Sequence, residues 1–138
     1  MSHVGDPKRL KEITDATSKY IKKLHRKLKF DAIVVTGLSG AGIGFPVAYK
    51  TGIPIVYVRK SKVDTHGNDI EGMNALSLMR DLKYIILDDL IATGKTVKKV
   101  MRTMRREYHA ECVGILLYCY GSDHLGEEDN PPVYKVYP

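Results

Sequence analysis

The sequence lacks features that would direct the chain into or across a membrane. No apolar run reaches the roughly 18 residues that a membrane-spanning helix needs, and Met1–Asp6 lack the apolar centre of a signal peptide. Only two cysteines occur among the 138 residues, Cys112 and Cys119. Both lie in one apolar segment and should point to opposite faces of a strand, so we expect two buried thiols, no disulfide and a reducing, cytoplasmic location.

Internal repeats and low-complexity stretches are also missing from the sequence, and its length predicts one domain over residues 1–138. With 43% hydrophobic and 28% charged residues, the composition is that of a folded chain with one core. The formal net charge of +6 fits an anionic ligand and equally fits nucleic acid. Because the basic residues are spread along helices, a solvated face is the ordinary interpretation of this charge.

Hydrophobic periodicity predicts helices that alternate with strands. The strands are continuous apolar runs, which indicates an α/β fold with a mostly parallel, twisted sheet flanked by helices. The expected helices cover residues 7–29, 41–50, 75–80 and 93–108, and the expected strands cover 30–35, 53–58, 84–87, 111–120 and, at the sheet edge, 133–136.

Three segments should meet beyond the carboxyl ends of these strands, where ligands bind in such sheets. They are the turn after Val35, the loop after Val58 and the turn after Leu87. The loop, residues 59–74, is polar and long for so small a domain, which is typical of a mobile or functional segment.

The turn after Leu87 carries the clearest chemistry. Asp88 and Asp89 end an apolar strand, and Thr93–Thr96 then open a helix. Unpaired amides at a helix start, the helix dipole and the threonine hydroxyls together suit a phosphate monoester. The aspartates would repel that phosphate, but they suit sugar hydroxyls or a place beside Mg²⁺. Together these groups suit ribose 5-phosphate; the alternative is a capped helix after two exposed aspartates.

Every position from Tyr84 to Thr96 matches the signature with which type I phosphoribosyltransferases bind 5-phosphoribosyl-1-pyrophosphate (PRPP). The chain resembles that family over about residues 30–120. The resemblance implies a Rossmann-like core, Asp88 and Asp89 on the ribose hydroxyls as catalytic groups, and Mg²⁺ brought by PRPP close to them. It also implies that the 5′-phosphate is bound by Ala92, Thr93, Gly94, Lys95 and Thr96.

In this family the turn after the first strand binds pyrophosphate through backbone amides and often holds a cis peptide. The corresponding amides here are those of Leu38, Ser39 and Gly40 in the turn Thr36–Gly40. The stretch Val58–Lys62 resembles the basic stretch of adenine phosphoribosyltransferases, which implies that Arg59, Lys60 and Lys62 face pyrophosphate. A plain tight turn and a solvated basic loop are the alternatives. The segment 63–73 matches the mobile lid in position only, and His66 within it either touches pyrophosphate or lies on the surface.

The residue at position 92 bears on the identity of the acceptor base, because it is not an aspartate. Hypoxanthine-guanine members of the family carry an aspartate where this chain has Ala92, whereas adenine members often have alanine there. Adenine enzymes use a lid glutamate, for which Glu71 is the candidate; an exposed loop glutamate is the alternative. The N-terminal helix 7–29 and the tail 121–138 would form a small hood over the base.

The resemblance implies a homodimeric enzyme that transfers the phosphoribosyl group of PRPP to a nucleobase, with a purine favoured and orotate, uracil and xanthine open. We expect neither a membrane nor nucleic acid as its partner. The alternative is a PRPP-binding regulator without catalysis, and a PRPP-using protein with an atypical acceptor is a third option. The regulator could contact nucleic acid through the basic face of helix Lys95–Arg106, formed by Lys98, Lys99, Arg102, Arg105 and Arg106.

Overall fold

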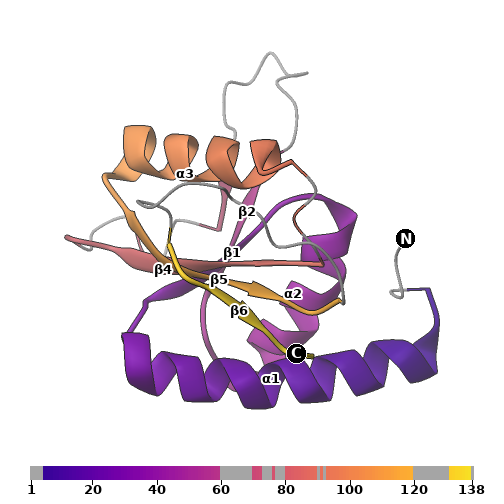
Figure 1. Ribbon diagram of the computed structural model, residues 1–138. Coiled ribbons are helices and arrows are strands. Elements are labelled where there is room, and N and C mark those ends of the chain that lie inside the picture. Colours follow the sequence, from indigo (N-terminus) through magenta and orange to yellow (C-terminus); the bar gives the residue numbers. More distant parts are fainter. Residues whose placement is uncertain are drawn as a thin grey trace.

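A computed structural model describes residues 5–59, 70–72, 76, 80–89, 91, 93–119 and 131–137. Three layers form an α/β fold, in which a sheet lies between α3 on one face and α1 with α2 on the other (Figure 1). In chain order the elements are α1 (Pro7–Leu28), β1 (Ala32–Val35), α2 (Gly37–Thr51), β2 (Ile55–Val58), β3 (Ile70–Glu71), β4 (Lys83–Asp88), α3 (Lys95–Tyr108), β5 (Glu111–Leu117) and β6 (Val133–Lys135).

The six strands form one sheet in the order β3-β2-β1-β4-β5-β6. Neighbouring strands from β2 to β6 run parallel, and β3 pairs with β2 in the antiparallel direction. The predicted α/β fold with a mostly parallel sheet is therefore confirmed. Strand β3 was not predicted, because a two-residue strand inside a polar segment has no periodicity to reveal it.

The central strands are buried on both faces, which explains their continuous apolar sequences. In β1, Ile33 and Val35 belong to the apolar cluster beneath α1 and α2, whereas Ala32 and Val34 belong to the cluster beneath α3. All four side chains are fully buried. Because β1 and β4 are neighbours and the helices after them, α2 and α3, lie on opposite faces, the fold has its topological switch point between these two strands.

Helix α1 forms where its sequence predicts it. The carboxylate of Asp6 accepts a hydrogen bond from the amide of Lys8, Pro7 occupies the first turn, and Lys29 ends the helix in a left-handed conformation with a φ of 53°. Ile13, Ile21 and Leu24 are buried in the cluster that α1 shares with α2. Helix α1 is thus part of the layer that covers one face of the sheet.

Helix α2 differs from its prediction. It ends at Gly52 as expected, with a φ of 75°, but it begins at Gly37, so the expected turn Thr36–Gly40 is mostly the first turn of the helix. The family often has a cis peptide in this turn, but none of the described peptide bonds is cis. The helix predicted around 75–80 falls largely outside the described residues.

The two cysteines lie on opposite sides of the sheet, as predicted. Cys112 packs against the cluster under α3, and Cys119 packs against the cluster under α1 and α2. Both are free thiols, and each is half-buried, so they are less buried than predicted. In the part of the chain that the structure describes, no helix has the length and apolar character needed to cross a bilayer.

Candidate functional site

The acidic pair lies at the carboxyl end of β4, beside the switch point. Asp88 is the last residue of the strand, and both carboxylate side chains are half-buried. Backbone hydrogen bonds hold both residues beyond the strand: the amide of Tyr118 donates to the carbonyl of Asp88 at 3.1 Å, and that of Cys119 donates to the carbonyl of Asp89 at 3.0 Å. The amide of Asp89 also donates to Oδ1 of Asp88 at 2.9 Å. The backbone of the pair is therefore fixed by the strand next to it.

The start of α3 follows the acidic pair on the same edge of the sheet. Gly94 precedes the helix with a φ of 83°, a left-handed conformation that glycine adopts without steric cost. Thr93, Lys95 and Thr96 are exposed, and the first turn contains no acidic residue. The amide of Lys95 donates to Oγ1 of Thr93 at 3.3 Å. The other amides of this turn have no helical acceptor, and the dipole places partial positive charge on them. This helix start has the donors and the field that a phosphate group requires.

The start of α2 lies at the same edge, after β1. Thr36 is extended, Gly37 has a φ of 68°, and Leu38, Ser39 and Gly40 occupy the first helical turn. The residues predicted to bind pyrophosphate through their amides therefore present them from a helix start instead of a tight turn. Because α2 and α3 begin on opposite sides of the switch point, two helix starts face the same edge of the sheet.

Two glycines bring α2 close to the sheet. A Cβ atom on Gly40 would lie 3.0 Å from the carbonyl oxygen of Leu87 and 3.2 Å from Cβ of Val35, and one on Gly44 would lie 2.6 Å from Cγ1 of Val35. Such distances leave no room for a side chain without movement of the strand or helix. The glycines therefore allow the first turn of α2 to sit directly beside the end of β4, where the acidic pair begins.

Two predicted site residues from different segments form an ion pair. Nη2 of Arg59, just after β2, donates to Oε1 of Glu71 on β3 at 2.9 Å, and their side chains are 39% and 59% exposed. Nζ of Lys99 on α3 also donates to the carbonyl of Arg59 at 3.4 Å. Glu71 was expected in a lid without regular structure, but strand pairing with Tyr57 holds it in β3.

Two side-chain hydrogen bonds that the sequence did not predict tie the strand ends together. Oγ1 of Thr36 donates to the carbonyl of Val58 at 2.7 Å and thereby links the ends of β1 and β2. Oη of Tyr118 donates to the carbonyl of Ser39 at 2.7 Å and links the end of β5 to α2. A buried threonine at the end of an apolar strand could have been noticed in the sequence. Tyr118 gives no such signal, because tyrosine is common in strands.

Some predicted site residues lie outside the described part of the chain. These are Lys60, Lys62, His66 and Ala92. The described residues bring together Asp88, Asp89, the starts of α2 and α3, and Arg59 at one edge of the sheet. Within the described residues, no group of three His, Cys, Asp or Glu side chains gathers as a metal site.

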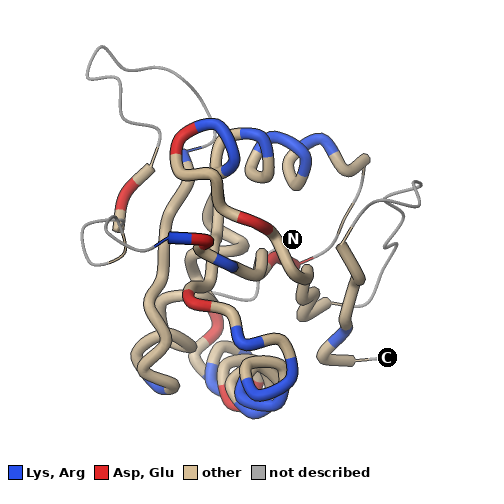
Figure 2. Tube along the Cα trace, turned by 90° about the vertical axis from the view of Figure 1, so that its left-hand side faces the viewer, with Lys and Arg blue, Asp and Glu red and all other residues tan. Residues whose placement is uncertain are grey.

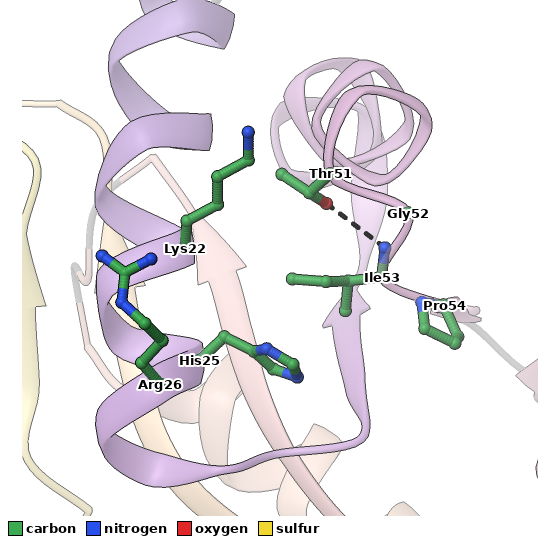
Figure 3. A pocket seen from close by; sticks show the side chains of 7 residues that line it. All are labelled: Lys22, His25, Arg26, Thr51, Gly52, Ile53 and Pro54. Carbon is green, nitrogen blue, oxygen red and sulfur yellow. Dashed lines mark hydrogen bonds between the residues drawn. The ribbon is translucent and has the colours of Figure 1, made fainter.

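Two hollows lie away from the acidic pair. One, of about 350 Å³, is lined by Phe45, Ile55, Tyr57, Glu71 and Gly72 and adjoins the Arg59–Glu71 pair. The other, of about 260 Å³, lies before the amino end of β2 and is lined by Lys22, His25, Arg26, Thr51, Gly52, Ile53 and Pro54 (Figure 3). There the His25 ring reaches toward Ile53 and Pro54. Lys22 and Arg26 of α1 lie near the C-terminal end of α2, where positive charge interacts favourably with the helix dipole. These two cations therefore suit a structural role in holding α1 against α2.

Positive charge is concentrated on the two outer helices. Lys and Arg follow α3 at the top and α1 at the bottom of the molecule, on opposite faces of the sheet (Figure 2). The acidic pair lies between these layers, at the edge where α3 begins. The edge can therefore receive an anionic ligand on the helix starts while two carboxylates accept hydrogen bonds from its neutral hydroxyls.

Comparison with known proteins agrees with this arrangement. Residues 5–136 match the family model described as "Phosphoribosyl transferase domain". Adenine phosphoribosyltransferase of Acetivibrio thermocellus is 30% identical over 124 residues, which are 82% of this chain and 70% of that protein. Xanthine phosphoribosyltransferase of Lactobacillus acidophilus is 25% identical over 83% of this chain, which spans only 65% of that relative.

Two further proteins that this chain resembles have other names. The transcriptional regulator GfcR of Methanocaldococcus jannaschii is 26% identical over 93% of this chain and 61% of its own length. The crystal structure of orotate phosphoribosyltransferase from Francisella tularensis superposes with a TM-score of 0.73 at 17% identity, covering 96% of this chain and 68% of that one. At that identity the likeness concerns the fold.

Proposed function

This chain belongs to the phosphoribosyltransferase family, and from that premise we propose that it transfers the 5-phosphoribosyl group of PRPP to a nucleobase and releases pyrophosphate. The observation that carries the proposal is the arrangement at the carboxyl edge of the sheet. There α3 begins a short turn after the acidic pair, and the start of α2 lies beside the same strand end. PRPP has three parts that match these elements: its 5′-phosphate suits the start of α3, its ribose suits the acidic pair, and its pyrophosphate suits the start of α2.

The ribose 5-phosphate half of PRPP would occupy the turn between β4 and α3. The amides of Ala92–Thr96 and the hydroxyls of Thr93 and Thr96 would bind the 5′-phosphate. Asp88 and Asp89 would accept hydrogen bonds from the ribose hydroxyls. As the bond between C1 and the pyrophosphate oxygen breaks, their negative charge would stabilise the oxocarbenium-like sugar.

The pyrophosphate half would lie against the first turn of α2. The amides of Leu38, Ser39 and Gly40 and the side chains of Arg59, Lys60 and Lys62 would stabilise the charge that develops on the leaving group. PRPP would bind as its magnesium complex, because Mg²⁺ prefers one or two carboxylates together with substrate phosphate oxygens. Asp88 and Asp89 are the carboxylates on the described edge that suit this role.

For the acceptor we favour a purine. Ala92 occupies the position where oxopurine enzymes of the family carry an aspartate, and Glu71 is our candidate for contact with the base. The Arg59–Glu71 pair would have to open for that contact. The proteins that this chain resembles are named for adenine, xanthine and orotate, so the assay must include all three bases.

The test is pyrophosphate release from Mg-PRPP in the presence of each base in turn. We expect turnover with a purine, and the double variant Asp88→Asn with Asp89→Asn should lose at least about a hundredfold in kcat while keeping its fold, because both carboxylates contact the reacting sugar. Circular dichroism checks the fold. Wild-type activity in the double variant would contradict the proposed role of the acidic pair. Absence of turnover by the wild-type protein with every base would contradict the proposed enzymatic activity.

A second candidate function is a PRPP-binding regulator that contacts nucleic acid. It is favoured by the basic outer side of α3, where Arg102, Arg105 and Arg106 are exposed, and by the likeness to a transcriptional regulator. Binding to duplex DNA or RNA that falls steeply with salt, together with PRPP binding and no turnover, would support this function over the first.

We also propose that the chain forms a homodimer through α2. Three large apolar side chains of α2 are exposed to solvent: Leu38 (68%), Phe45 (50%) and Tyr49 (93%). Exposed apolar side chains of this size are typical of an interaction surface. Phe45 lies about two helical turns after Leu38, and Tyr49 lies about one turn after Phe45. The three side chains can therefore form one stripe along α2. Phe45→Glu with Tyr49→Glu should therefore convert the dimer to a monomer in sedimentation experiments. A monomeric wild-type chain would contradict the proposal.

A further inference from the structure

Tyr118 makes a connection that its place in the sequence does not suggest. It lies one residue beyond β5, and only 1% of its surface is exposed. Its ring belongs to the apolar cluster under α1 and α2, and its hydroxyl leaves this cluster to donate to the carbonyl oxygen of Ser39 at 2.7 Å. A hydroxyl buried to this extent needs an acceptor, and this one finds it in the first turn of α2.

The same residue is also bound to the acidic pair. The amide of Tyr118 donates to the carbonyl of Asp88 at 3.1 Å, and the next amide, that of Cys119, donates to the carbonyl of Asp89 at 3.0 Å. Tyr118 therefore joins two parts of the edge, one through its backbone and one through its side chain. Those parts are the strand end that carries the aspartates and the helix start that faces the proposed pyrophosphate site.

The bond to Ser39 anchors the first turn of α2. The Ser39–Gly40 peptide group is planar, so a bond to the Ser39 carbonyl also restrains the backbone of Gly40. Gly40 packs tightly against the end of β4, since a Cβ atom on it would lie 3.0 Å from the carbonyl oxygen of Leu87. Together these contacts hold the first turn of α2, with the amides of Leu38 and Ser39, beside the strand end that carries Asp88.

The phenol remains a donor under ordinary conditions. Burial raises the pKa of Tyr118 well above its usual value of 10.0, and the nearby carboxylates of Asp89 and Asp88 raise it further.

We propose that Tyr118 is a positioning residue for the pyrophosphate half of the PRPP site: its hydroxyl, bound to the carbonyl of Ser39, anchors the first turn of α2 in the position that binds pyrophosphate. This rests on the function proposed above. Tyr118 touches no part of PRPP in this role and acts through the backbone of α2. Its effect should therefore be confined to ligands that carry pyrophosphate, because the start of α3 holds the 5′-phosphate without it.

Calorimetric titrations with PRPP, pyrophosphate and ribose 5-phosphate, all with magnesium, test this. Tyr118→Phe should weaken PRPP and pyrophosphate about fivefold to tenfold, the effect of one lost hydrogen bond, and leave ribose 5-phosphate unchanged. The control is Tyr108→Phe, which removes the hydroxyl of a half-buried tyrosine at the C-terminal end of α3, on the other face of the sheet. It should leave all three affinities unchanged.

Unchanged affinity for PRPP in Tyr118→Phe, or an equal loss for PRPP and ribose 5-phosphate, would overturn the positioning role while leaving the proposed function intact. No binding of PRPP to the wild-type protein would overturn the proposed function itself. As a second measurement, the amide ¹⁵N shift of Gly40 should move in Tyr118→Phe and stay in place in Tyr108→Phe. An unmoved Gly40 shift would count against the proposal even if the variant were less stable.

Discussion

Among single residues, Arg59 and Glu71 are two predicted site residues that form an ion pair with each other. Both residues were predicted to serve the reaction, one on pyrophosphate and one on the base. In the structure they bind each other at 2.9 Å across β2 and β3. Pyrophosphate would therefore compete with Glu71 for the guanidinium group, and the exchange would release Glu71 toward the base.

We predict that Glu71→Gln tightens the binding of pyrophosphate about twofold to fivefold, because an exposed ion pair contributes at most about 1 kcal/mol and its loss frees Arg59. Calorimetry measures this, and Glu107→Gln is the matched control. Glu107 forms a similar exposed pair with Arg106 at 3.0 Å on α3. Weaker or unchanged binding in Glu71→Gln would show that the pair does not compete with the ligand.

At the scale of elements, the site depends on where two helices begin. Local signals predicted α1, the end of α2 at Gly52 and the approximate start of α3, because periodicity and capping residues act over a few positions. The start of α2 was missed. Its glycines suggest a turn, whereas Gly40 and Gly44 serve to bring the helix against Val35 and Leu87, a long-range contact that local sequence does not record.

The conformation of Gly94 gives a prediction about α3. Its φ of 83° is strained for a residue with a Cβ atom, so Gly94→Ala should cost about 1–2 kcal/mol of stability and turn the first amides of the helix away from the phosphate. We expect ribose 5-phosphate to bind at least tenfold more weakly. Gly52→Ala is the control, since Gly52 has a φ of 75° at the other end of the sheet with open space around it.

In this comparison both alanine variants should lose similar amounts of stability by chemical denaturation. Only Gly94→Ala should lose affinity for ribose 5-phosphate. Equal affinities in the two variants would contradict the assignment of the phosphate to the start of α3.

For the whole molecule, the fold itself assembles the site. The α/β sequence pattern was sufficient to predict a mostly parallel sheet and ligand binding at its carboxyl edge. It could not predict the cross-links between strand ends, such as the bonds from Thr36 to Val58 and from Tyr118 to Ser39, because each joins residues far apart in the chain. Such bonds become visible only once the strand order is known.

The buried ionisable groups predict how stability depends on pH. Burial raises the pKa of Cys112 from 9.0 to about 12, and burial also raises the pKa values of Tyr84 and Tyr118 above their usual 10.0. Above pH 9 the unfolded chain therefore releases protons that the folded chain keeps. The free energy of unfolding should fall by about 1.4 kcal/mol per pH unit for each such group, beginning with Cys112.

Urea denaturation from pH 7 to pH 10.5 measures this dependence. Stability should be fully retained below pH 9, and Cys112→Ala should flatten the decline between pH 9 and pH 10. A wild-type profile that stayed level or rose above pH 9, or a variant profile with the same slope, would show that the thiol of Cys112 ionises as readily in the folded chain as in the unfolded one.

If the start of α3 and the acidic pair together hold ribose 5-phosphate, a calorimetric titration of the wild-type protein with that ligand and magnesium will detect it. We expect saturable binding to one site per chain, weakened at least tenfold by Thr93→Val with Thr96→Val and by Asp88→Asn with Asp89→Asn. Absence of any heat of binding from the folded wild-type chain, or wild-type affinity in both double variants, would contradict this assignment.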